Sequence, residues 1–121
     1  MNPADELAAL YAQWRSLSDE EGAAIDASAW VQVEQFQLAK ARLQPRITEV
    51  SQRLDAGTHR QQFDPVLQEL MQLERRNAAL LQQQRERTEQ QLQDLDRSSR
   101  HLRQLQKSYV SPAQMQWQSY S

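Results

Sequence analysis

Two histidines, an acidic run and a basic run are the side chains of this 121-residue chain that could take part in catalysis or ligand binding. His59 and His101 stand alone, because neither belongs to a HExxH motif or to another spacing that gathers metal ligands on one helix face. We therefore expect both to have surface or capping roles. The chain contains no cysteine, which excludes disulfides, thiolate metal sites and cysteine nucleophiles.

Each charge run is open to a functional and a structural interpretation. The run 19–21, Asp-Glu-Glu, could form an acidic site, but we favour a solvated helix end, since exposed charge runs are common. The basic run consists of Arg97, Arg100, His101, Arg103 and Lys107. It could contact phosphate or an acidic partner, but basic residues also suit a helix C-terminus, and aromatic side chains are absent between them. The sequence predicts no catalytic, cofactor-binding or metal site, and therefore not an enzyme.

The composition indicates helices as the elements that must position any site. Only two Gly and four Pro occur, which are too few for the turns of a sandwich or barrel, and no strand alternation is visible. Gln, Leu, Ala, Arg and Glu dominate, and all five favour helices. We predict an all-α fold: an antiparallel helical hairpin or bundle of three long helices plus a short C-terminal helix. Apolar residues make up 39%, so we expect a thin core: the chain is either elongated, or a second copy in a homodimer or a partner completes its core.

The charge is unevenly distributed. Residues 1–28 carry one Arg against six acids, while the net charge of the whole chain is only −2. Such a balance favours neither direct nucleic-acid binding nor a membrane surface. The first residues lack a basic region followed by an apolar run, and no stretch approaches a membrane span. We expect a cytoplasmic protein with no membrane insertion.

Periodic apolar residues predict the first two helices. Asn2 and Pro3 are typical of a helix start, and the first helix is expected to end near Glu21, with Gly22 as its stop. Asp26 is expected to cap the second helix. Its stripe consists of Ala29, Val33, Phe36, Lys40, Leu43, Ile47, Val50 and Leu54, in which the stem of Lys40 can still cover apolar surface. Pro45 should kink this helix and Gly57 should end it.

The third helix has two possible starts, a capping box at Thr58 or the pair Asp64-Pro65. Apolar residues are frequent from Phe63 to Leu81, whereas residues 82–91 contain no large apolar side chain. The pattern resumes at Leu92, Leu95, Leu102, Leu105 and Tyr109, so the helix is either continuous or bent around residues 96–99. We divide the chain into a helical body, residues 1–110, and a short helix or tail, residues 111–121.

The aromatic residues are expected either to pack in the core or to line a groove. Trp14, Trp30 and Phe36 lie on the predicted buried stripes, so core packing is the simpler interpretation. Some of them could instead line a groove for an apolar partner helix. Trp117 and Tyr120 follow a helix break in a polar tail and need a surface on which to dock.

The whole chain resembles FliT, the family of flagellar type III export chaperones that bind the filament-cap protein FliD. The resemblance consists of Leu10-Tyr11-x-x-Trp14-x-x-Leu17, Ala29-Trp30 with the stripe from Val33 to Ile47, Pro65-x-Leu67-x-x-Leu70, Asn77-x-x-Leu80-Leu81 and Leu105-x-x-x-Tyr109. FlgN, the related chaperone of hook-junction proteins, shares the helical plan and the Asn-x-x-Leu-Leu element. The positions of Trp14 and Trp30 favour FliT.

The resemblance implies a cytoplasmic chaperone that binds the C-terminal segment of FliD and delivers it to the export ATPase and the export gate. It also implies possible binding of the regulator FlhDC, and a last helix that can cover the binding surface. For that cover the chain offers Met115, Trp117 and Tyr120. We expect an amphipathic cargo segment to lie in a groove between the second and third helices. The candidate partner-binding residues are Phe36, Leu43, Ile47, Leu70, Leu73 and Leu80.

Two alternatives remain open at this point. One is a FlgN-like chaperone of hook-junction proteins. The other is a structural coiled-coil component of the export apparatus, although the polar gap at residues 82–91 argues against a continuous apolar seam.

Overall fold

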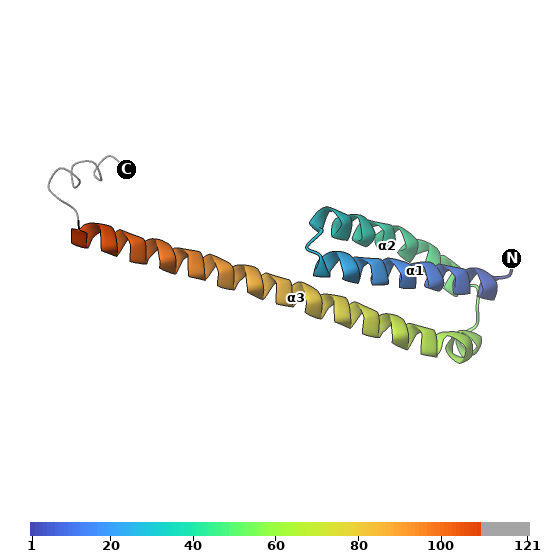
Figure 1. Ribbon diagram of the computed structural model, residues 1–121. Coiled ribbons are helices and arrows are strands. Elements are labelled where there is room, and N and C mark those ends of the chain that lie inside the picture. Colours follow the sequence, from blue (N-terminus) through green and yellow to red (C-terminus); the bar gives the residue numbers. More distant parts are fainter. Residues whose placement is uncertain (110–121) are drawn as a thin grey trace. The chain divides into compact units, whose positions relative to one another are not determined.

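The computed structural model describes residues 1–109, in which every regular element is an α-helix, and this confirms the all-α class. Helix α1 comprises Pro3–Asp26, α2 Trp30–Ser51 and α3 Ala56–Tyr109 (Figure 1). The chain divides into two compact units, residues 1–84 and residues 85–121. The predicted short C-terminal helix, with Met115, Trp117 and Tyr120, lies outside the described residues.

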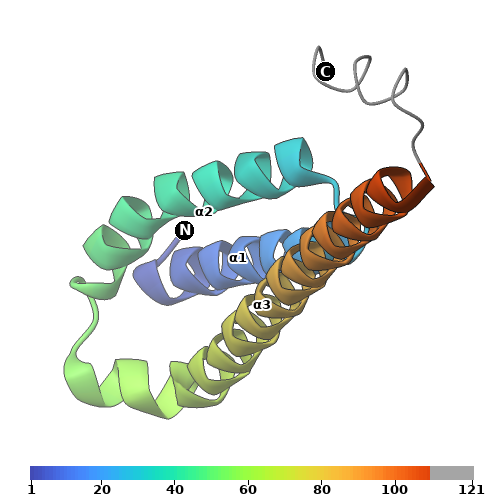
Figure 2. The same ribbon diagram turned by 90° about the vertical axis from the view of Figure 1, so that its left-hand side faces the viewer.

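The first unit is a three-helix bundle built from α1, α2 and the part of α3 that precedes residue 85. Figures 1 and 2 show α1 and α2 side by side as an antiparallel hairpin, with this part of α3 running along them. The turn between α1 and α2 is short because Ser28 adopts a left-handed backbone conformation, with φ of 56°.

The start of α1 agrees with the sequence, but its end does not. Asn2 caps the helix, since its Oδ1 accepts a hydrogen bond from the backbone N–H of Asp5 at 2.9 Å. Gly22 was expected to end the helix, yet α1 continues to Asp26. The glycine instead allows α3 to approach closely, because a Cβ atom at Gly22 would lie 2.6 Å from Oδ1 of Asn77. Asp26 therefore ends α1 and does not cap α2, which begins after Ala29 without a side-chain cap.

The predicted boundary between the second and third helices also needs correction. Helix α2 passes through Pro45 and ends at Ser51, so Gly57 does not end it and lies in the first turn of α3. Neither predicted start of α3 is the real one. Asp55 caps α3: its Oδ1 accepts from the backbone N–H of Thr58 at 2.8 Å, and its Oδ2 accepts from the Thr58 hydroxyl at 2.7 Å.

Two apolar clusters form the core of the first unit. The first apolar cluster consists of Leu7, Leu10, Tyr11, Val50, Phe63 and Leu70. The second apolar cluster consists of Ala24, Ile25 and Val33, with Ala29, Phe36, Leu80 and Leu81 packed against it. Between the two clusters, along each of the three helices, lie polar residues that we call the polar layer: Ser18, Glu21, Lys40, Glu74 and Asn77. The bundle is thus apolar, polar and apolar in turn along its length.

The part of α3 in the second unit has a different character. Every described side chain from residue 85 to residue 108 is exposed, including the four leucines of that stretch. Residues 82–91, which have no large apolar side chain, are nevertheless helical, and α3 is continuous through residues 96–99. The continuous alternative is therefore the one that the structure adopts.

Candidate functional site

An open groove on the first unit is the candidate binding site. It has a volume of about 550 Å³ and is lined by residues of all three helices: Tyr11, Trp14, Gln44, Ile47, Thr48, Leu67, Leu70, Met71, Glu74 and Arg75. A volume of this size suits a drug-sized ligand or a few side chains of a partner. Tyr11 and Trp14 come from α1, and the other lining residues come from α2 and α3.

The structure brings only part of the predicted partner-binding set into this groove. Ile47 and Leu70 line it. Leu43 and Leu73 are partly buried against the first apolar cluster. Phe36 and Leu80 pack against the second apolar cluster, beyond the polar layer, and do not line the groove. Periodicity identified the inward face of each helix but could not separate groove positions from core positions on that face.

The groove combines an apolar interior with polar side chains. Apolar atoms come from Trp14, Ile47 and Leu67 among others, while Gln44 and Arg75 add polar groups. Met71 is half-exposed although it lines the groove, so its flexible thioether side chain is available to a partner. An amphipathic segment could therefore bury its apolar side chains here and direct its polar side chains toward water.

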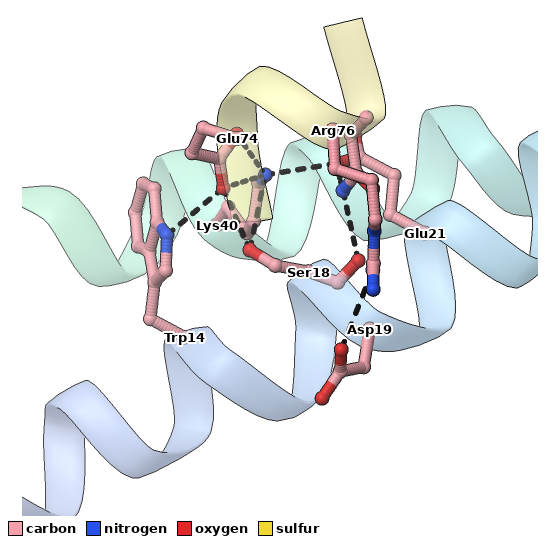
Figure 3. Close-up of polar contacts among 8 residues, drawn as sticks. Trp14, Ser18, Asp19, Glu21, Lys40, Glu74 and Arg76 are labelled. Atoms are coloured by element: carbon pink, nitrogen blue, oxygen red, sulfur yellow. Dashed lines mark hydrogen bonds and ion pairs between the residues drawn. The ribbon is translucent and has the colours of Figure 1, made fainter. Parts of the chain in front are cut away.

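The polar layer lies directly beside the groove and centres on Lys40 (Figure 3). Its ammonium group donates to Oε1 of Glu21 at 2.9 Å and to the two carboxylate oxygens of Glu74 at 2.7 and 2.9 Å. A longer contact of 3.4 Å reaches the Ser18 hydroxyl. The Lys40 and Glu21 side chains are 8% and 4% exposed and that of Glu74 is 40% exposed, so one carboxylate is buried and the other borders solvent.

Further hydrogen bonds close this network. The Ser18 hydroxyl donates to Oε1 of Glu74 at 2.6 Å. The Asn77 amide donates to Oε1 of Glu21 at 2.9 Å and to the backbone carbonyl of Ser18 at 2.8 Å. Within the described residues, no buried side-chain nitrogen or oxygen lacks a hydrogen-bond partner. The buried charges are thus paired as well as hydrogen-bonded, which a low-polarity interior requires.

The pKa of Glu74 is lowered by its partners. Burial alone would raise the pKa of this carboxyl, but the hydrogen bonds from Lys40 and Ser18, together with the charge of Lys40, outweigh burial and hold the pKa below its ordinary value. The indole N–H of Trp14 also donates to Oε1 of Glu74, at 3.1 Å. Because Trp14 and Glu74 line the groove as well, the polar layer fixes part of the groove wall.

Three interpretations of individual residues change with the structure. Glu21 is buried and paired with Lys40, so the acidic run is not simply a solvated helix end, although Asp19 and Glu20 are exposed. Lys40 was expected to cover apolar surface with its aliphatic stem, but its ammonium group is buried as well. Trp30, expected in the core, is exposed at the start of α2.

His59 has a structural contact that the sequence did not indicate. Its Nε2 lies 3.0 Å from the hydroxyl of Tyr11, and the two rings meet edge to face with Phe63 close by. Burial raises the pKa of the Tyr11 hydroxyl. His59 therefore neither caps α3 nor lies free on the surface. His101 is exposed, as expected.

The polar layer could have been found from the sequence. Ser18 and Glu21 follow Trp14 by four and seven residues, and Asn77 follows Leu70 by seven, so all three lie on buried helical stripes. A polar residue at the same level of each stripe is a signal for a buried network. Among residues 1–109, no group of three His, Asp or Glu side chains is placed to hold a metal ion, and no described helix is long and apolar enough to cross a membrane.

Comparison of the chain with protein-family models, curated proteins and solved structures finds no match.

Proposed function

We propose that this protein is a non-enzymatic chaperone that holds an amphipathic segment of a partner protein in the groove between α2 and α3. The observation that carries the proposal is the groove itself, which combines apolar walls with the half-exposed Met71 on the first unit. Helices that offer such a surface commonly bind the apolar face of a partner helix. The affinity would come mainly from burial of apolar surface, at about 25 cal/mol per Å² before the costs of association.

We propose, more narrowly, that the partner is the C-terminal segment of the filament-cap protein FliD. The resemblance to FliT chaperones in the helical motifs supports this choice. Five residues of those motifs line the groove: Tyr11, Trp14, Ile47, Leu67 and Leu70. In this role the protein works in the cytoplasm, delivers its cargo to the export ATPase and gate, and can contact the regulator FlhDC.

Calorimetry with the FliD C-terminal segment tests the proposal. The segment should bind both the full chain and a chain that ends at Tyr109. Segments of hook-junction proteins, tested in parallel, separate the FliT-like function from the FlgN-like one by their relative affinities. If neither segment bound either form of the protein, the chaperone proposal would be wrong.

A matched pair of variants tests the position of the binding site. Met71 lines the groove and is 52% exposed, while Leu38 on α2 is 51% exposed and lies outside the groove. Met71→Lys should weaken cargo binding by roughly 5- to 30-fold, because one contact in a largely apolar interface is replaced by a charge. Leu38→Lys should leave binding unchanged. Equal effects of the two substitutions would place the cargo elsewhere.

A further inference from the structure

Four leucines form an exposed apolar stripe on α3 within the second unit. This leucine stripe consists of Leu92, Leu95, Leu102 and Leu105, whose side chains are 61%, 65%, 64% and 42% exposed. At 100° per residue they fall within an arc of about 140°, so they share one face of the helix. An unpartnered row of this kind on one helix face is typical of an interaction surface.

The spacing of the leucine stripe is the same in both chain directions. Leu92 and Leu105 lie equally far from the midpoint between Ser98 and Ser99, and so do Leu95 and Leu102. The two serines fall within the same arc and are the small residues at its centre. A second copy of this helix, turned to run in the opposite direction, would therefore bring Leu95 of each copy against Leu102 of the other at the centre of the stripe. Leu92 and Leu105 of the second copy would share a level at the two margins of the interface. The small serines would allow the two backbones to approach where the copies cross.

The charges on the same stretch change sign at its centre. Residues 86–96 contain four acids and one base, whereas residues 97–107 contain four bases and no acid. Two copies in parallel register would place acid beside acid and base beside base. Two antiparallel copies would place the acidic half of each beside the basic half of the other. Charge complementarity thus selects the antiparallel arrangement.

One edge of the leucine stripe shows how individual charges would meet. Glu89, Asp96, Arg103 and Lys107 share this edge. In an antiparallel pair centred on the two serines, Glu89 lies within one helical turn of Lys107 of the second copy, and Asp96 within one turn of its Arg103. In a parallel pair this edge would face the opposite edge of the stripe, which carries Asp94 and His101, so Asp96 would lie beside an acid and Arg103 would have no acidic partner there.

We propose that two copies of the chain associate through the leucine stripe as antiparallel helices, with a two-fold axis beside Ser98 and Ser99. The occupant of the exposed apolar face is a second copy, because the pattern of leucines and charges complements itself and needs no other sequence. Two-fold symmetry is the commonest symmetry of protein dimers. The interface uses only residues 85–109 and is independent of cargo binding in the groove.

Sedimentation of the full chain tests the association. The expected mass is twice the 14.1 kDa of one chain. The protein concentration should be raised to about 1 mM, so that a weak dimer is also detected. Leu95→Gln combined with Leu102→Gln should weaken the dimer at least tenfold, because each copy loses the two leucines at the centre of the interface. Glutamine preserves helix propensity, so the helix itself should remain. Leu38→Gln, an exposed leucine on α2, is the control and should leave the dimer intact.

Cysteine cross-linking tests the direction, because the natural chain has no cysteine that would interfere. In the antiparallel pair, a mixture of Leu95→Cys and Leu102→Cys chains should form a disulfide dimer, whereas Leu95→Cys alone should not. The two copies of residue 95 would then lie about 10 Å apart along the helix, too far for a disulfide. In a parallel pair, Leu95→Cys alone would cross-link.

Three results would overturn the inference: a monomer throughout the concentration range, a dimer that tolerates the glutamine variant, or cross-linking of Leu95→Cys with itself. Circular dichroism of the glutamine variant shows whether its helices are intact. None of these measurements involves cargo. A result that overturns the dimer therefore does not affect the groove proposal, and a lack of cargo binding does not affect the dimer proposal.

Discussion

At the scale of single residues, burial of the charged Lys40 and Glu21 carries a large desolvation penalty, which their ion pair and hydrogen bonds offset. The ammonium is buried with Glu21, and Glu74 joins them at the border of the groove. A buried ion pair of this kind often adds little net stability compared with apolar side chains of similar size. Loss of one partner is different, because it leaves a buried charge without compensation.

Substitution of Lys40 measures this asymmetry. Lys40→Met keeps the length of the stem but leaves the buried Glu21 carboxylate without its cation, so we expect a loss of about 3–5 kcal/mol in the free energy of unfolding. Arg53→Met, which removes an exposed partner of Glu49, should cost about 0–1 kcal/mol. Urea denaturation gives both values. Equal losses in the two variants would mean that the Lys40 charge has no special role.

Acid should weaken the bundle through Glu74. The pKa of this carboxyl is lower in the folded chain than its ordinary value of 4.5, so its ionised form stabilises the fold above about pH 4.5. That contribution is lost as the pH falls through the folded pKa, because the unfolded chain then binds the proton more readily. Glu74→Gln should reduce the drop in the urea midpoint between neutral and acid pH. Glu20→Gln, an exposed carboxylate of α1, should leave the drop unchanged.

At the scale of elements, the positions where helices begin and end show what tertiary contacts add to local sequence signals. Gly22 looks like a helix stop, yet it lies inside α1 because α3 passes close to it. Thr58 and Asp64 both look like caps, yet Asp55 supplies the cap. Local propensity predicted that three helices exist. Their boundaries depended on neighbours that are distant in sequence.

The two glycines provide a matched test of this distinction. Gly22→Ala should gain about 1 kcal/mol in helix propensity but lose more, since the new methyl group would lie 2.6 Å from Oδ1 of the buried Asn77. We expect a net destabilisation of about 1–3 kcal/mol. Gly57→Ala meets only Asp55 Oδ1 at 3.4 Å and should be neutral or stabilising. A stabilised Gly22→Ala protein would show that α3 can move aside.

At the scale of the whole molecule, the sequence predicted the fold class and two groove residues, Ile47 and Leu70. It missed Tyr11 and Met71 and left Trp14 open between core and groove, because a periodic pattern gives the inward face of a helix and not the spacing between helices. The polar layer was missed since each member was judged on its own helix, where Lys40 could be explained by its stem and Glu21 by its charged neighbours.

Removal of the second unit tests whether the bundle is complete without it. Both apolar clusters and the whole polar layer come from residues 1–84. A chain that ends at Gln84 should therefore unfold cooperatively in urea, with a midpoint close to that of the full chain. Residues 85–108 after it are exposed and bury little surface against the bundle. A chain that failed to fold would show that the bundle depends on residues 85–121.

The polar layer also limits how the helices can slide past one another. A shift of α2 by one turn along α1 would bring Phe36 or Leu43 to the level of Glu21 and move Lys40 among apolar side chains. Such a slipped alignment leaves charges unpaired, so the layer fixes a single alignment of the three helices. The groove residues Trp14, Ile47 and Leu70 are then held at fixed levels relative to one another. If the groove holds a partner as proposed, the sizes of the partner's side chains would decide the fit, because the groove cannot adjust by moving its helices lengthwise.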